Sequence, residues 1–139
     1  MRLPWVDREV FANGYYGVIV LRQFWDLFSP LFLVASIKNN VVGYTIGATA
    51  LQEDCTELPV GWILVLAVIP KARRFGVGRS LTTELCQRLR GVGLFDIRLT
   101  VDPVNSAARC LYESIGFQEF ETEFGYYGDS EDRILMSLK

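Results

Sequence analysis

Hydrophobic residues recur along the chain with two different spacings, and these spacings predict its helices and strands. Apolar side chains three or four residues apart predict helices, whereas alternating or unbroken apolar runs bounded by turn residues predict strands. The helices expected on this basis cover residues 7–12, 18–28, 80–90 and 105–115. The expected strands cover residues 31–38, 41–51, 62–69, 95–101, 118–124 and 134–138.

The order of these elements predicts a mixed α/β domain in which helices cover a sheet. Asn39-Asn40 favours a hairpin turn between the first two strands, and residues 52–59 form a polar loop before the third. The chain of 139 residues contains no linker, repeat or low-complexity tract. It is therefore predicted to be one domain over residues 1–139.

The amino-acid composition excludes several kinds of catalytic and binding site. Cys55, Cys86 and Cys110 have no C-x-x-C spacing, which indicates a reducing cytosol and argues against a disulfide framework or a zinc site. The chain has no histidine, which excludes Ser-His-Asp and Cys-His catalysis and histidine-ligated metals. A net charge of −2 gives no basis for general nucleic-acid binding. No metal and no nucleic-acid partner are expected.

One apolar segment, residues 18–37, needs a separate test for membrane insertion. It is interrupted by Arg22, Asp26 and Pro30, and its longest uncharged part, residues 27–37, is too short to span a bilayer. No signal peptide is visible. We therefore expect a cytoplasmic protein without a membrane partner, and its oligomeric state, monomer or homodimer, stays open.

The segment after the third expected strand carries the most distinctive chemistry. Arg73-Arg74-Phe75-Gly76-Val77-Gly78 is a basic, glycine-containing loop that leads into an amphipathic helix. This arrangement suits a pyrophosphate, because glycine lets the backbone approach the anion and the first N–H groups of the helix point at it. An ordinary strand-to-helix connection with solvated arginines is the alternative.

A second motif, from Asn105 to Phe117, has the form N-x-x-A-x-x-L-Y-x-x-x-G-F. The two motifs together resemble the GNAT superfamily of N-acetyltransferases, and the resemblance covers roughly residue 31 to the C-terminus. It implies an α/β fold with a mixed, mostly antiparallel central sheet flanked by helices. The cofactor would be wedged where two parallel central strands splay. The first strand of that fold is expected to be missing, because of a late start or a shorter sheet edge.

The resemblance also implies acetyl-CoA as the cofactor and a role for each motif residue. The pantetheine arm would pair with the backbone of Leu66, Ala67 and Val68, and the N–H near Val68 would polarise the thioester carbonyl. Tyr112 would protonate the departing thiolate. The remaining cofactor contacts would come from Arg73, Arg74, Phe75, Gly76, Val77, Gly78, Arg79, Ser80, Asn105 and Arg109.

Two of these residues have structural alternatives. A phenol with a pKa of about 10 is protonated at neutral pH and can donate to sulfur, which suits Tyr112 as an acid. The alternative for Tyr112 is a core aromatic. Asn105 is a helix N-cap by position, and the sequence does not separate that role from a cofactor contact.

The chain departs from the family at the general base. Some relatives carry glutamate or tyrosine where this chain has Trp62, and others carry histidine near the position of Thr100. At pH 7 about one-tenth of an α-amine is neutral but only about 0.04% of a lysine, a difference of about 3 kcal/mol. A missing base therefore favours an α-amine acceptor, although Glu53, Asp54 or Glu57 could relay a proton through water.

The segment from Tyr126 to Met136 resembles the Y-Y-x-x-x-E-D-x-x-x-M ending of protein N-terminal acetyltransferases, including the ribosomal-protein alanine type. In those enzymes the tyrosine-bearing loop covers the peptide N-terminus. The resemblance implies acceptor contacts from two opposite walls, with Trp62 as a further contact. The wall residues are Tyr126 and Tyr127 on one side and Tyr15 and Tyr16 on the other. A polar hairpin whose tyrosines pack on the sheet is the alternative.

These observations predict an acetyl-CoA-dependent N-acetyltransferase. It would transfer the acetyl group to a primary amine by direct attack in a ternary complex, and the favoured acceptor is the α-amine of a protein or peptide. Two alternatives stay open. The acceptor could be a small amine such as an amino acid, a polyamine or an antibiotic, or the domain could be an acyl-CoA-binding sensor without turnover.

Overall fold

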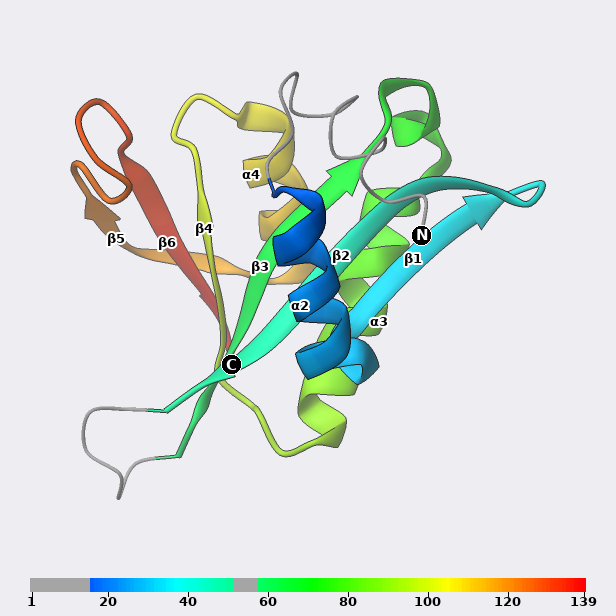
Figure 1. Ribbon diagram of the computed structural model, residues 1–139. Coiled ribbons are helices and arrows are strands. Elements are labelled where there is room, and N and C mark those ends of the chain that lie inside the picture. The colour runs from blue at the N-terminus through cyan, green and yellow to red at the C-terminus, as the bar shows by residue number, and fades with distance from the viewer. Residues whose placement is uncertain (1–15, 52–57) are drawn as a thin grey trace.

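The computed structural model describes residues 16–51 and 58–139 (Figure 1). The helix expected over residues 7–12, the absence of a first strand, Tyr15 and the acidic residues 53–57 concern positions outside this part. The elements are α2 (Val18–Phe28), η1 (Ser29–Leu31), β1 (Phe32–Ile37), β2 (Asn40–Ala50), β3 (Val60–Val68), η2 (Pro70–Phe75), α3 (Val77–Gly91), β4 (Ile97–Val101), α4 (Ser106–Ile115), β5 (Gln118–Glu123) and β6 (Arg133–Leu138).

The strands form one sheet in the order β1-β2-β3-β4-β6-β5. Every neighbouring pair is antiparallel except β3 and β4, which are parallel. Their shared register consists of Gly61 opposite Ile97 and Trp62 opposite Arg98, so the two strands diverge after their first residues. Figure 1 shows this divergence, with α4 behind it. The mostly antiparallel sheet with a splayed parallel pair is confirmed.

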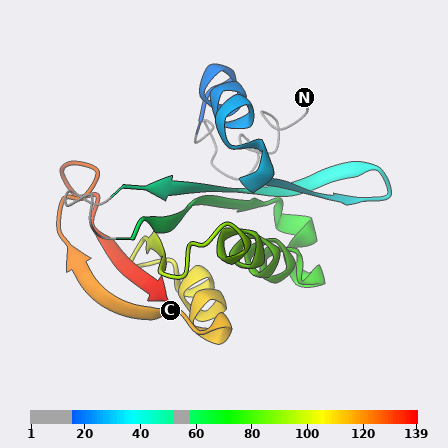
Figure 2. The same cartoon turned by 90° about the horizontal axis from the view of Figure 1, so that it is seen from below.

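Helices cover the two faces of the sheet unequally. Figure 2 shows α2 on one face and α3 and α4 on the other. The core between α3 and the sheet contains Leu81, Leu85 and Leu89, whose side chains are buried against β2 and β3. Full burial of each such side chain is worth about 1.5–3 kcal/mol, so this layer anchors α3 against β2 and β3. No helix in residues 16–51 and 58–139 is long and apolar enough to cross a membrane.

One boundary differs from the sequence prediction in a way that bears on the site. The helix α3 begins at Val77 and not at Ser80, and η2 occupies the segment expected as an open loop. Gly76 separates the two helices in a left-handed conformation with φ of 72°, which favours glycine. The glycine motif therefore forms the first turn of α3 itself.

Candidate functional site

A cavity of about 710 Å³ lies between the diverging ends of β3 and β4. We call the part lined by β3, η2 and α3 the β3–α3 side, and the part lined by β4 and β6 the β4–β6 side. Residues of α4 line the cavity between them. The lining residues are Ile63, Leu64, Val65, Leu66, Val68, Arg73, Gly76, Gly78, Arg79, Leu99, Thr100, Val101, Asp102, Asn105, Ala107, Ala108, Leu111, Tyr112 and Arg133.

The backbone of β3 presents hydrogen-bonding groups to this cavity. Just beyond the strand, the N–H of Ile69 donates to the Val42 carbonyl on β2 at 2.9 Å. Because these groups alternate in direction along a strand, the N–H groups of Val68 and Leu66 face away from β2 and toward the divergence. An extended ligand can therefore pair with β3 where β4 has moved away.

Thr45 of β2 makes a hydrogen bond to β3 beside a bulge in the β2–β3 pairing. The β2–β3 register shifts between Ile46 and Gly47, which lie opposite Val65 and Ile63. The fully buried Thr45 donates its hydroxyl to the Val65 carbonyl at 2.8 Å. A bulge disrupts the backbone ladder locally, and this bond satisfies a carbonyl beside it. Thr45 thus helps to fix the path of β3 along the cavity.

The first turn of α3 is suited to an anion. The first intrahelical donor is the N–H of Ser80, which bonds the Gly76 carbonyl at 3.0 Å. The N–H groups of Val77, Gly78 and Arg79 precede it, and no side chain caps this end. These N–H groups and the helix dipole give a positive potential. A Cβ on Gly76 would meet no atom within 4 Å, so conformation and not space requires glycine there.

Two arginines line the cavity on the β3–α3 side, and both are held by bonds to other elements. The Nε of Arg73 donates to the Val68 carbonyl at 3.0 Å, which ties η2 back to the end of β3. The Nη2 of Arg79 donates to the hydroxyl of Ser114, which ties α3 to α4. Each guanidinium keeps further N–H donors for an anion at the start of α3.

Tyr112 is both a core residue and a cavity residue. Its side chain is buried, lines the cavity from α4 and makes an edge contact with Phe117 at 5.8 Å between ring centroids. Burial, and then the nearby Cys86 thiol, raise the pKa of Tyr112 to about 12. The phenol is therefore protonated at neutral pH, on a residue that lines the cavity.

Asn105 caps α4, as its position predicted. Its side-chain oxygen accepts from the N–H of Ala108 at 3.1 Å, which satisfies one of the first donors of the helix. This bond uses the oxygen, and the amide N–H₂ keeps its two donors on a residue that lines the cavity. The two roles expected for Asn105 are thus geometrically compatible.

Arg109 lies apart from the cavity. It donates to the Pro103 carbonyl at 3.1 Å and to Glu119 at 2.7 Å, and that hydrogen bond and charge raise its pKa. The structure thus places Arg109 between the β4–α4 loop and β5.

The tyrosine loop adjoins the β4–β6 side. The rings of Tyr126 and Tyr127 make an edge contact at 4.7 Å, and the hydroxyl of Tyr127 lies 3.5 Å from that of Thr100. Burial is the main cause that raises the pKa of Tyr126. The loop is closed by the N–H of Gly125, which donates to Asp132 at 2.8 Å. Through Thr100 and Arg133 this loop reaches the cavity lining.

The sequence-predicted residues whose side chains the structure describes, a set that leaves out Tyr15 and Arg74, divide into two groups. Those that line the cavity are Leu66, Val68, Arg73, Gly76, Gly78, Arg79, Asn105 and Tyr112. Those that the structure describes outside the lining are Tyr16, Trp62, Ala67, Phe75, Val77, Ser80, Arg109, Tyr126 and Tyr127. Among these, Phe75 is 74% exposed, and Tyr16 packs against Phe24 of α2 at 5.1 Å.

Sequence reasoning missed Asp102, Leu111 and Arg133 as lining residues. The signal for Asp102 was its place directly after a strand of the parallel pair, because ligands bind at the carboxyl ends of such strands. Arg133 had no comparable signal, since it enters the lining only through the pairing of β6 with β4. No group of three or more His, Cys, Asp or Glu side chains that could hold a metal occurs among the described residues.

Comparison with known proteins agrees with this geometry. The model of the acetyltransferase (GNAT) family matches residues 3–117. A mycothiol acetyltransferase of Thermobispora bispora is 35% identical over 106 residues, which are 76% of this chain and 36% of that protein. The chain thus spans about a third of the length of that relative. An N-alpha-acetyltransferase of Sulfurisphaera tokodaii is 31% identical over 88% of this chain and 75% of its own length.

A solved structure gives the same result. Chaetomium thermophilum Naa20, crystallised in complex with a bisubstrate analogue, superposes with a TM-score of 0.82 and 26% identity, over 90% of this chain and 74% of that one. The resemblance found in the two sequence motifs is therefore confirmed. The family model covers most of this chain, and the chain shares its fold with Naa20. This chain therefore belongs to the GNAT family of acetyltransferases.

Proposed function

We propose that the protein transfers an acetyl group from acetyl-CoA to the α-amine of a protein or peptide N-terminus. The observation that carries this proposal is the continuous cavity from the uncapped start of α3, along the unpaired edge of β3, to the phenol of Tyr112. The N-alpha-acetyltransferase relative and the bisubstrate complex of Naa20 support the choice of acceptor.

The residues present fit acetyl-CoA. The N–H groups of Val77, Gly78 and Arg79, with the side chains of Arg73 and Arg79, would hold the pyrophosphate. The β3 edge at Leu66 and Val68 would pair with the amides of the pantetheine arm. When bound, acetyl-CoA supplies an activated thioester carbonyl. The N–H of Val68 would donate to the oxygen of that carbonyl and favour attack on its carbon.

Tyr112 would supply the proton that the reaction needs at sulfur. The phenol would donate its proton to the thiolate as the carbon–sulfur bond breaks and the amine nitrogen takes the place of sulfur on the carbonyl carbon. The proton that the amine loses would pass to water, and the phenolate would be reprotonated from solvent. Because burial raises the pKa of Tyr112 to about 12, the proton is present at neutral and mildly alkaline pH, where an α-amine is partly neutral.

The acceptor must lose a proton without an obvious base. Neither Trp62 nor Thr100 can take one near neutral pH, and the Thr100 hydroxyl lies 3.5 Å from that of Tyr127. The neutral fraction of an α-amine at pH 7 exceeds that of lysine by more than about 100-fold, so an α-amine depends less than lysine on a general base.

A small amine is the second candidate for the acceptor. The observation that favours it is the similarity to a protein named mycothiol acetyltransferase.

The test is acetyl-CoA consumption, followed by the release of free thiol. The acceptors are peptides with free N-termini, the same peptides blocked at the α-amine but bearing lysine, and a panel of small amines. Turnover confined to free N-termini is the expected result. Turnover on small amines alone would replace this proposal with the second candidate. Acetyl-CoA binding without turnover on any acceptor would contradict both.

A further inference from the structure

Arg133 is an arginine of the cavity that the acetyl-CoA contacts leave unused. Its side chain is 15% exposed and lines the cavity, although it comes from the first residue of β6. The strand order places β4 between Arg133 and β3, so it belongs to the β4–β6 side. The other lining arginines, Arg73 and Arg79, lie at η2 and the start of α3.

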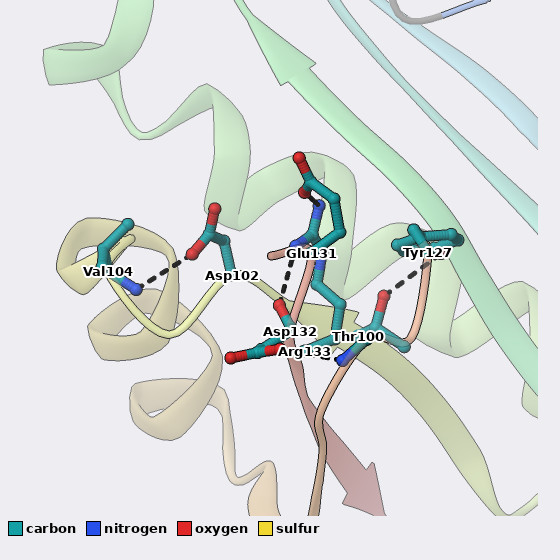
Figure 3. A network of polar contacts seen from close by, with 8 residues as sticks. Thr100, Asp102, Val104, Tyr127, Glu131, Asp132 and Arg133 are labelled. Atoms are coloured by element: carbon teal, nitrogen blue, oxygen red, sulfur yellow. Dashed lines mark hydrogen bonds and ion pairs between the residues drawn. The ribbon is translucent and has the colours of Figure 1, made fainter. Parts of the chain in front are cut away.

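Three contacts with its own loop hold this guanidinium (Figure 3). Nη1 donates to the Asp132 carbonyl at 2.7 Å, and Nη2 donates to the Glu131 carboxylate at 3.2 Å. The guanidinium also lies over the ring of Tyr127, 5.1 Å from its centroid. These contacts fix the direction of Arg133 but use only part of its fork of five N–H donors.

The two carboxylates near Arg133 do not prevent it from binding an anion. Among the described lining residues, Asp102 is the acidic one, and its carboxylate already accepts from the N–H of Val104 at 3.1 Å. The Glu131 side chain that pairs with Arg133 is 53% exposed. Such exposed ion pairs contribute little, so Glu131 can turn into water when a better-placed carboxylate arrives. Arginine binds a carboxylate through two parallel hydrogen bonds more selectively than lysine does.

Resting on the proposed function, we propose that Arg133 binds a carboxylate of the acceptor close to its reactive amine. The substrate class is therefore peptides whose first or second residue is Asp or Glu. Arg133 could make the same contact with the α-carboxylate of a free amino acid. Free amino acids are therefore included among the acceptors to be tested.

The first measurement is binding and needs no turnover. Conjugates of coenzyme A and acetylated peptides with Asp or Asn in the first or second position differ in charge but hardly in shape. We expect the wild-type protein to bind one Asp conjugate at least tenfold more tightly than its Asn partner. The Arg133→Gln variant should bind both conjugates equally, and Arg133→Lys should keep part of the preference.

The matched control is Arg98→Gln. Arg98 also stands on a strand, pairs with a carboxylate, that of Asp96 at 2.8 Å, and lies over an aromatic ring, that of Phe120 at 5.5 Å. It does not line the cavity, so its replacement should leave the Asp preference intact. Glu131→Gln should increase the preference two- to threefold, because it removes the competing carboxylate. Circular dichroism of each variant checks that the fold is retained.

The second measurement is kcat/KM for the matching free peptides and for free amino acids, and it separates this inference from the proposed function. Acetylation of N-termini without preference for acid would overturn the role of Arg133 and leave the proposed function standing. Acetylation of free amino acids alone, lost in Arg133→Gln, would keep the carboxylate contact and overturn the peptide acceptor. Equal binding of the Asp and Asn conjugates by the wild-type protein would overturn the inference outright.

Discussion

The two sides of the cavity are made from different parts of the chain. The β3–α3 side is one continuous segment, from Val60 to Arg79, and it offers mainly backbone N–H groups. The β4–β6 side joins Thr100 of β4 and Arg133 of β6, both in contact with Tyr127 of the neighbouring loop, and it offers side chains. The backbone N–H groups of the β3–α3 side suit a ligand with repeating polar groups and an anion. The side chains of the β4–β6 side suit discrimination between similar acceptors.

This difference determines how each side responds to mutation. Backbone donors survive most side-chain changes, so the β3–α3 side should be most sensitive to changes in the conformation of the chain or in the charge at the start of α3. On the β4–β6 side the contacts come from side chains, so a single replacement should change selectivity while leaving the fold intact.

The largest effect is expected for Gly76→Asp. A side chain at φ of 72° strains the backbone, and a carboxylate there would repel the pyrophosphate that we propose to bind at the start of α3. We expect acetyl-CoA affinity to fall by more than about 100-fold, because the strain and the repulsion act together. Isothermal titration calorimetry with acetyl-CoA measures this loss.

The matched control for that variant is Gly91→Asp at the other end of the same helix. There φ is ordinary and a Cβ would meet nothing within 4 Å, so affinity should be unchanged. Gly76→Ala separates strain from charge and should give an intermediate loss. Wild-type affinity in Gly76→Asp would mean that this turn does not hold the anion.

The next effect in size is expected for Tyr112→Phe, which removes the hydroxyl that we propose as the proton donor. A general acid typically contributes about 10²- to 10⁴-fold in rate, so kcat should fall by at least about 100-fold. Acetyl-CoA affinity should change little, since the ring remains packed against Phe117. Single-turnover kinetics and calorimetry on the same preparation separate the two quantities. An unchanged rate would exclude Tyr112 as the acid.

The sequence predicts the β3–α3 side of the cavity better than the β4–β6 side. The helix Val18–Phe28 and the strands around the glycine motif were predicted because their apolar periods and turn residues are local. Gly76, Gly78, Asn105 and Tyr112 were predicted because they belong to motifs with fixed spacing, and all line the cavity. Arg133 could not be predicted, because strand register places it there. Phe75 shares the motif but is exposed, which spacing alone does not distinguish.

A moderate effect is expected for Thr45→Val, which tests whether the backbone of the β3–α3 side depends on one side chain. Without the hydroxyl, the Val65 carbonyl loses its 2.8 Å bond at a buried position, which costs about 1–3 kcal/mol of stability. The bulge in β3 should also relax and lower kcat about three- to tenfold, a rate change worth about 1 kcal/mol. Urea unfolding and steady-state kinetics measure the two effects.

Thr82→Val is the matched control for this prediction. Thr82 is equally buried and donates to the Gly78 carbonyl at the same 2.8 Å, but within α3. It should lose stability without a comparable loss of kcat. If both variants lose kcat in proportion to stability, Thr45 has no special role in shaping β3.

The smallest effect is expected in alkaline solution, where it reports how completely Tyr112 is buried. Burial raises its pKa from 10.0 to about 12, so the folded state holds the phenolic proton more tightly than the unfolded chain does. This stabilisation is complete below pH 10 and is lost as pH rises through the folded pKa. Between about pH 9 and 11 it should lower the free energy of unfolding by about 1 kcal/mol.

Tyr112→Phe should remove this part of the alkaline loss, and urea unfolding of both proteins across that pH range measures it. The Cys86 thiol, whose pKa is raised to about 11 by burial, contributes a loss of its own in both proteins and cancels in the comparison. Parallel curves would mean that the phenol is solvated in the folded state. Converging curves would show that the phenol proposed as the proton donor is also buried in the core of the folded protein.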